Sequence, residues 1–283
     1  MIDKWWIYLI LYLILYVIYT QYYKIAANNT KNDGALTILL QLLSGLILLI
    51  LIPIFKFKLP SNLLTYIFLI IACLFYAFSD RTNTTARRGL NVSTFSILNQ
   101  LSTVFIIIFG VIFLKEALII KKIIGAGLII FGNIISIYKS KEKSWDKYCL
   151  YGLIGNLSLA IAVTIDVGIS EEFNLPLYVS FTLIVPAILL ILIERIKLKD
   201  IINEYKIGSK KAILIVCLIW GITEITILRA YQLGSVAVVA PLSSIKTLLN
   251  VFVAHFIFKE SDSLAKKIIA AIIVILGVVI INI

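Results

Sequence analysis

Two stretches of this 283-residue chain match each other without a gap and decide the fold. Residues 71–116 read IACLFYAFSDRTNTTARRGLNVSTFSILNQLSTVFIIIFGVIFLKE, and residues 215–260 read IVCLIWGITEITILRAYQLGSVAVVAPLSSIKTLLNVFVAHFIFKE. The shift of 144 positions leaves ten of the 46 pairs identical, including Thr103 with Thr247 and the Lys-Glu dipeptides that end both stretches. Apolar sequences often match by chance, so these polar coincidences carry the inference of an internal repeat.

The composition around this repeat is that of a membrane protein. Hydrophobic residues make up 61% of the chain, charged residues make up 14%, and the mean hydropathy is +1.05. A hydrocarbon core of about 30 Å takes about 20 apolar residues per helical crossing. Apolar runs between charged or turn-rich residues predict ten crossings and leave no polar stretch for a separate soluble domain. The predicted spans are residues 5–23, 34–55, 63–85, 92–114, 119–138, 148–170, 175–193, 212–229, 236–258 and 264–283.

The number of helices in each repeat determines how the two halves are oriented. The repeat divides the chain into residues 1–140 and 141–283, with five predicted helices each, within a single membrane domain. Because five is odd, the second half must begin on the opposite side of the membrane. The predicted fold class is therefore an all-α integral membrane protein with ten transmembrane helices in two inverted five-helix repeats. In transporters, such repeats place a site near the membrane midplane and permit alternating access.

The ends of the two halves share a family pattern. Each half closes with a helix, a Lys-Glu turn and a glycine-marked final helix, in FGVIFLKEALIIKKIIGAGLIIFGNIISI (109–137) and VAHFIFKESDSLAKKIIAAIIVILGVVII (253–281). Together with AYQLGSVAVVAPLSSIKTLLNVF (230–252), this pattern resembles the EamA-like group of the drug/metabolite transporter superfamily over essentially the whole chain. The resemblance implies ten helices in inverted halves and transport of amino acids, amines, other metabolites or drugs. A few relatives move lipid-linked sugars.

Ionisable residues inside spans are the first candidates for a substrate site, because each costs about 2.5–3.5 kcal/mol at a helix centre. Asp80 and Glu224 occupy equivalent positions in the two repeats. An aromatic residue stands four positions earlier in each span, Tyr76 and Trp220, on the same helix face as the carboxylate. Charge and cation–π attraction predict that such a doubled face binds a cationic group. The alternative is a structural role, in which each carboxylate pairs with a nearby base such as Arg81.

Two further charged residues, Lys246 and Asp166, also have a binding and a structural interpretation. Lys246 lies ten residues into its predicted span, too deep for its ammonium to reach the interface easily. It holds a substrate carboxylate or it neutralises Glu224 or Asp166. Asp166 lies near the end of its span and is a binding residue or simply interfacial.

Uncharged polar residues of the fourth and ninth spans form a second group of substrate-binding candidates. They are Asn99, Gln100, Ser243, Ser244 and Asn250. The shift of 144 places Asn99 on Ser243 and Gln100 on Ser244. Such side chains line cavities, but they also join helices to each other in lipid at about 0.6 kcal/mol apiece.

Small residues in the fifth and tenth spans have a structural interpretation. Gly125 and Gly132 are seven residues apart, and Ala270 and Gly277 repeat this spacing. Small residues on one stripe let helix backbones approach closely. We therefore expect these positions to serve helix packing.

The sequence disfavours several other functions. One His and three Cys are too few and too scattered for the usual metal, haem or iron–sulfur sites, so no cofactor and no metal are expected. The net charge of +11 resides mostly in connections between spans, where Lys and Arg orient helices, so no nucleic-acid partner is needed to explain it. Enzyme motifs such as H-E-x-x-H or a Walker loop do not occur, and we expect no enzyme.

These observations predict a secondary transporter or facilitator in the plasma or inner membrane. Its expected partners are membrane lipid and a small-molecule substrate: an amino acid, an amine or a related organic cation. A flippase for a lipid-linked sugar is the alternative within the fold, and an integral membrane enzyme is the alternative of another class. Proton coupling through Asp80 or Glu224, a monomeric or dimeric state, and the side on which the termini lie stay open.

Overall fold

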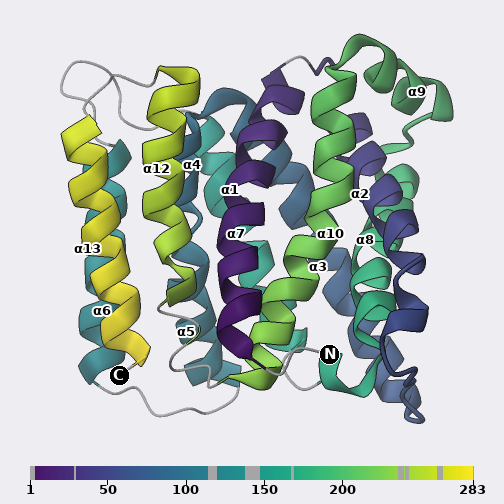
Figure 1. Cartoon of the computed structure of the whole chain (residues 1–283), viewed down its shortest axis with the longest axis horizontal. Helices are drawn as coiled ribbons and strands as arrows, with labels where there is room; N and C mark the ends of the chain where they lie inside the picture. The colour runs from purple at the N-terminus through teal and green to yellow at the C-terminus, as the bar shows by residue number, and fades with distance from the viewer. Residues whose placement is uncertain are drawn as a thin grey trace.

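The computed structural model describes residues 4–28, 30–113, 120–137, 147–166, 169–234, 239, 242–259 and 264–282 (Figure 1). Within these ranges the chain is all-helical and contains no strand. The helices are α1 (Trp5–Asn28), α2 (Asp33–Leu49), α3 (Leu63–Gly89), α4 (Val92–Leu98), α5 (Leu101–Phe113), α6 (Ile120–Ile137), α7 (Lys147–Asp166), α8 (Leu175–Glu194), α9 (Leu198–Ile207), α10 (Lys210–Leu233), α12 (Ile245–Phe258) and α13 (Leu264–Asn282). Short 3-10 turns occupy Ile52–Ile54 and Ser170–Glu172.

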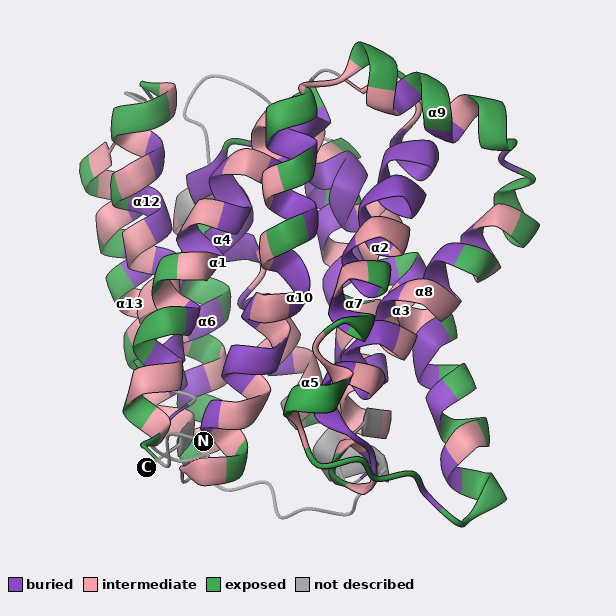
Figure 2. Ribbon diagram, turned by 45° about the vertical axis from the view of Figure 1, so that its right-hand side comes forward, coloured by how far each residue is buried: buried purple, intermediate pink, exposed green. Residues whose placement is uncertain are grey.

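The helices are those of a multi-pass membrane protein. Six of them are long and apolar enough to cross a bilayer, namely α1, α3, α7, α8, α10 and α13, and α2 and α12 are shorter apolar helices. Figure 1 shows the start of α1 and the end of α13 at one end of the bundle, with α9 at the opposite end. Buried residues concentrate on the central helices in Figure 2, whereas exposed residues mark the outer helices. Many of the exposed side chains are large and apolar, as a lipid-facing surface requires.

The predicted spans locate most helices well, but they differ from the structure in the second, fourth and ninth spans. In the ninth span, α12 begins at Ile245, and residues 236–238 and 240–241 lie outside the described residues. The second span was expected to continue to residue 55, whereas α2 ends at Leu49 and Pro53 lies in a 3-10 turn. Proline lacks the backbone N–H that would continue the helix. The fourth span was expected to be one helix, but a turn at Asn99 and Gln100 separates α4 from α5.

Helix α9 was not predicted at all, because its sequence is too polar to read as a crossing. Glu204 ties this helix to the connection between α1 and α2. Its carboxylate, on a residue that is 2% exposed, accepts hydrogen bonds from the Thr30 hydroxyl at 2.8 Å and from the backbone N–H groups of Lys31 and Asn32 at 3.2 and 2.8 Å. The three donors lie just before α2 and are part-buried. Glu204 therefore fixes a polar helix against the end of the bundle.

We expect Glu204→Ala to lower the stability of the protein by about 1–3 kcal/mol, because three part-buried donors lose their charged acceptor. A fall in the unfolding temperature of the purified protein measures this effect. Asn203→Ala is the matched control, since Asn203 is the exposed neighbour on the same helix. Equal unfolding temperatures for the two variants would contradict the role assigned to Glu204.

Four pairs of helices pack closely, and each pair is antiparallel. In every pair, a Cβ atom added to a glycine would meet the partner helix. Between α2 and α8, Gly34 would meet Glu194 and Gly45 would meet Ile184; between α3 and α7, Gly89 would meet Tyr148 and Gly155 would meet Asn83. Gly234, which follows α10, would meet Trp5 of α1, and Gly125 of α6 would meet Gly277 of α13. The pairs are therefore α2 with α8, α3 with α7, α1 with α10, and α6 with α13.

The glycines of α6 and α13 have the structural role expected from their spacing. A Cβ on Gly125 would lie 2.5 Å from the Gly277 carbonyl oxygen, and one on Gly277 would lie 2.7 Å from the Gly125 carbonyl oxygen. Two helical turns further along α6, a Cβ on Gly132 would lie 2.9 Å from the Ala270 carbonyl oxygen. The two backbones are thus in contact at two levels, which no larger side chain permits.

Candidate functional site

A row of four tyrosines on α1 forms the centre of the candidate site. Tyr12, Tyr16, Tyr19 and Tyr23 follow each other at spacings of four, three and four, which places them on one helix face. Successive ring centroids are 5.4, 6.0 and 5.5 Å apart, and all four residues are buried. Trp220 of α10 packs against the last two rings, at 5.7 and 5.9 Å. We call Tyr12, Tyr16, Tyr19 and Tyr23 the tyrosine ladder.

One cation lies at each end of the tyrosine ladder. At one end, the Lys246 ammonium donates a hydrogen bond to the Tyr12 hydroxyl and lies 4.6 Å from the centre of the Tyr16 ring. At the other end, the Arg87 guanidinium lies 4.5 Å from the Tyr23 ring and 5.3 Å from the Tyr19 ring. Aromatic faces attract both charges, and the attraction is stronger away from water.

Arg87 is buried without a close acidic partner in the described part of the chain. It is 8% exposed, and its Nη1 atom has no hydrogen-bond partner there. Besides the tyrosine ladder, the guanidinium contacts the Phe95 ring at 4.3 Å. Burying a cation is costly unless it is paired, so an unpaired Arg87 beside aromatic rings is a candidate for binding an anionic group of a ligand.

The two carboxylates predicted from the repeat come together beside the tyrosine ladder. Asp80 accepts a hydrogen bond of 2.8 Å from the Gln41 side chain. The charges of Glu224 and Arg87 both act on Asp80, and that of Lys246 acts on Glu224. The half-buried carboxylates of Asp80 and Glu224 thus lie close enough to interact, with Arg87 on the side of Asp80 and the half-buried Lys246 on the side of Glu224.

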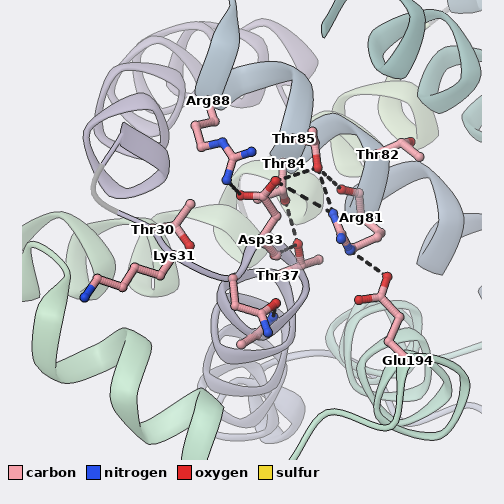
Figure 3. Close-up of polar contacts among 12 residues, drawn as sticks. Thr30, Lys31, Asp33, Thr37, Arg81, Thr82, Thr84, Thr85, Arg88 and Glu194 are labelled. Carbon is pink, nitrogen blue, oxygen red and sulfur yellow. Dashed lines mark hydrogen bonds and ion pairs between the residues drawn. The ribbon is translucent and has the colours of Figure 1, made fainter. Parts of the chain in front are cut away.

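Arg81 does not act as the partner of Asp80. Figure 3 shows Arg81 directed toward Asp33 and Glu194. The Arg81 Nε atom lies 2.6 Å from the Glu194 carboxylate, and Nη1 lies 4.0 Å from the Asp33 carboxylate. The expected alternative in which Arg81 neutralises Asp80 is therefore wrong. Arg81 instead joins α2, α3 and α8 at one end of the bundle.

The break between α4 and α5 lies at the Asn99–Gln100 pair predicted as a polar lining. Gln100 turns inward and donates a 2.9 Å hydrogen bond to the Thr247 hydroxyl of α12. Asn156 of α7, which is fully buried, donates to the Leu98 carbonyl oxygen at 3.2 Å and so satisfies a group near the break. Broken helices with satisfied backbone groups are typical of transporter binding sites.

A corresponding break precedes α12. Ser243 has helical backbone, Ser244 is a turn residue, and α12 begins at Ile245. Ser243 hydrogen-bonds Tyr231 of α10. The pair that the shift of 144 aligns with Asn99 and Gln100 therefore also lies at a turn that precedes a helix.

The remaining predicted binding residues lie further from the tyrosine ladder or outside the described residues. Asn250 is fully buried and accepts a 3.4 Å hydrogen bond from Gln21, while its own Nδ2 atom has no partner in the described residues. Tyr76 is partly buried one turn before Asp80 on α3. The side chain of Asp166 and the Lys-Glu turns at 115–116 and at Glu260 lie outside the described residues.

Sequence reasoning missed the tyrosine ladder, Arg87 and Gln41. The spacing of the tyrosines was visible in the sequence, but a membrane span rich in tyrosine also suits an interfacial helix. Arg87 stands near the predicted end of its span, where a basic residue normally faces water. Only the packing of α1 against α3 and α10 shows that these side chains share a buried site.

Comparisons with known proteins agree with this architecture. No curated protein matches the chain. A solved structure described only as a crystal structure of a protein is similar in fold, with a TM-score of 0.54 and 10% sequence identity over 95% of this chain and 93% of that chain. At this identity the likeness concerns the fold alone. Residues 3–138 match the EamA-like transporter family. This match assigns residues 3–138, just under half of the chain, to the EamA-like transporter family, which is part of the drug/metabolite transporter superfamily.

Proposed function

We propose that this protein carries a small zwitterionic or cationic metabolite, an amino acid or an amine, across the cell membrane by alternating access. The carrier consists of two inverted five-helix repeats, residues 1–140 and 141–283, with ten crossings. The observation that carries the proposal is the grouping of Asp80, Glu224, Arg87 and Lys246 around the tyrosine ladder. The match of residues 3–138 to the EamA-like transporter family supports a transport function.

The helix pairing supports the inverted repeats. A twofold axis in the membrane plane exchanges α1 with α7, α2 with α8, α3 with α10, and α6 with α13. That exchange turns the α1–α10 contact into the α7–α3 contact, and it maps the α2–α8 and α6–α13 contacts onto themselves. The α2–α8 and α6–α13 pairs are antiparallel, as such an axis requires, and the α1–α10 and α3–α7 pairs share one relative direction, also as it requires.

Contacts to the two helix breaks support the same symmetry. Tyr12 and Asn156 are 144 residues apart and therefore equivalent. Asn156 of the second half binds the Leu98 carbonyl oxygen in the first half, and Tyr12 of the first half binds Lys246 in the second. Each half thus supports the broken helix of the other, and a movement of one half would change both breaks together.

The charges of the site support the choice of substrate. An ammonium group is attracted by the carboxylates of Asp80 and Glu224 and by the tyrosine rings. A carboxylate group is attracted by Arg87, which has spare donors and is already desolvated. The balance of two acidic and two basic side chains suits a zwitterion better than a large organic anion.

Counterflow in liposomes tests this function. Liposomes that contain the purified protein are loaded with a high concentration of one unlabelled compound, and uptake of the same compound in labelled form is followed. The experiment is repeated for each member of a panel of amino acids, amines and nucleosides. We expect transient accumulation of at least one zwitterion or amine, because alternating access exchanges internal for external substrate. Accumulation of nucleosides only, or scrambling of labelled lipid-linked sugar without counterflow of any soluble compound, would contradict the proposal.

A further inference from the structure

A polar pocket lies at one end of the bundle, apart from the tyrosine ladder. Its volume is about 340 Å³, and it is formed where α2 begins, α3 ends and α7 begins. The residues that line it are Lys31, Asn32, Asp33, Arg81, Thr85, Arg88, Lys147, Tyr148 and Tyr151. Because helices that cross a bilayer end near its headgroups, we expect a pocket at the ends of α3 and α7 to lie at that level.

The lining is strongly basic, and its single carboxylate is already neutralised. Asp33 is 7% exposed, it pairs with Arg88 at 2.8 Å, and it accepts a 2.8 Å hydrogen bond from the Thr85 hydroxyl (Figure 3). The Lys31 side chain points away from Asp33, so its ammonium does not face this carboxylate (Figure 3). Arg81 pairs with Glu194 at 2.6 Å, so Arg88 and Lys147 remain as the two cations that face the pocket beside Asp33.

Arg88 and Lys147 have donors available for a ligand. The Arg88 side chain is 33% exposed and reaches Asp33 through one of its nitrogen atoms, which leaves other N–H groups for an anion. Lys147 is exposed, and its ammonium lies 5.2 Å from the centre of the Tyr148 ring. A fork of N–H groups beside an ammonium suits the oxygen atoms of a phosphate.

The pocket continues into an apolar surface that faces lipid. On α7, the exposed residues Tyr151, Ile154 and Leu157 follow Lys147 at helical spacing, with exposures of 39%, 41% and 39%. On the neighbouring α3, Phe78 is exposed one turn below Arg81. Tyrosines at this level are typical of the membrane interface. A polar pocket above two exposed apolar helices has the layout of a phospholipid, with its headgroup above its acyl chains.

We propose that this pocket binds the phosphate of an anionic phospholipid, with Arg88 and Lys147 as its main ligands and with the acyl chains along α3 and α7. Basic pockets between membrane helices are suited to anionic headgroups. The site is separate from the substrate site of the proposed function and does not depend on it. A free phosphate shares the recognition chemistry but has no use for the exposed apolar surface.

Lipid binding to the purified full-length protein tests this proposal. Native mass spectrometry is used to titrate phosphatidylglycerol and phosphatidylcholine onto the parent protein, Arg88→Gln and Lys147→Gln. We expect phosphatidylglycerol to bind in preference, and each substitution to weaken it about fivefold, the value of one basic residue near an anionic lipid. Lys199→Gln is the matched control, because Lys199 is an exposed lysine of α9 outside the pocket, and it should bind like the parent.

Three outcomes would overturn the proposal: equal binding of the two lipids, equal affinity in the pocket variants and the parent, or displacement of the bound lipid by millimolar inorganic phosphate. The last outcome would assign the pocket to a soluble phosphate. Arg88→Gln also removes the ion pair with Asp33, so the unfolding temperature of each variant is measured as well. If Arg88→Gln does not fold, Lys147→Gln alone decides, because Lys147 has an exposed side chain at the rim.

Discussion

Glu224→Gln is expected to reduce transport of an amine or amino acid by about 10- to 100-fold while the protein still reaches the membrane. The substitution keeps the size of the side chain and removes only its charge. That charge acts on both Lys246 and Asp80 beside the tyrosine ladder. Losing one charged contact with a substrate ammonium costs about 1.5–3 kcal/mol, which corresponds to this range. Initial uptake rates in liposomes, normalised to reconstituted protein, measure the effect.

Glu171→Gln is the control for this experiment, because Glu171 is an exposed glutamate in a connection. It should transport at the parent rate. Unchanged uptake in Glu224→Gln would defeat the carboxylate hypothesis. A loss of membrane yield with normal uptake per molecule would instead assign Glu224 a structural role, as a neutralising partner of Lys246.

Gly125→Ala is expected to destabilise the protein by about 1–3 kcal/mol through overpacking of α6 against α13. The added methyl group would lie 2.5 Å from the Gly277 carbonyl oxygen and 2.4 Å from the Ile281 side chain. A side chain can turn away, but the backbone oxygen moves only if the helices separate. The unfolding temperature in detergent, followed by circular dichroism, measures the loss.

Gly127→Ala provides a control on the same helix, two residues away. A Cβ on Gly127 meets nothing within 4 Å, so the substitution adds only the helix propensity of alanine, worth up to about 1 kcal/mol. We therefore expect a stability equal to or above that of the parent. A Gly125→Ala protein as stable as Gly127→Ala would show that α6 and α13 are not in backbone contact.

Much of the architecture follows from linear patterns. Hydropathy predicts which segments are helices, because a helix that crosses lipid must satisfy its own backbone and present apolar side chains. The repeat predicts that Asp80 and Glu224 are equivalent, and the glycine spacing predicts close packing of α6 and α13. The breaks at Asn99–Gln100 and Ser244 fall on polar pairs that the repeat had already matched.

The sequence by itself therefore determined the class of the protein, its similarity to the EamA-like transporter family and the alignment of its two carboxylates under the shift of 144 positions, since these depend on periodicity and self-similarity along the chain. Only the tertiary structure decided which side chains contact each other. It joins Arg81 to Glu194, encloses Arg87 in aromatic rings and places Glu204 against the start of α2. These contacts link residues from 64 to 172 positions apart, and their geometry depends on how helices lie across each other, which no local pattern encodes.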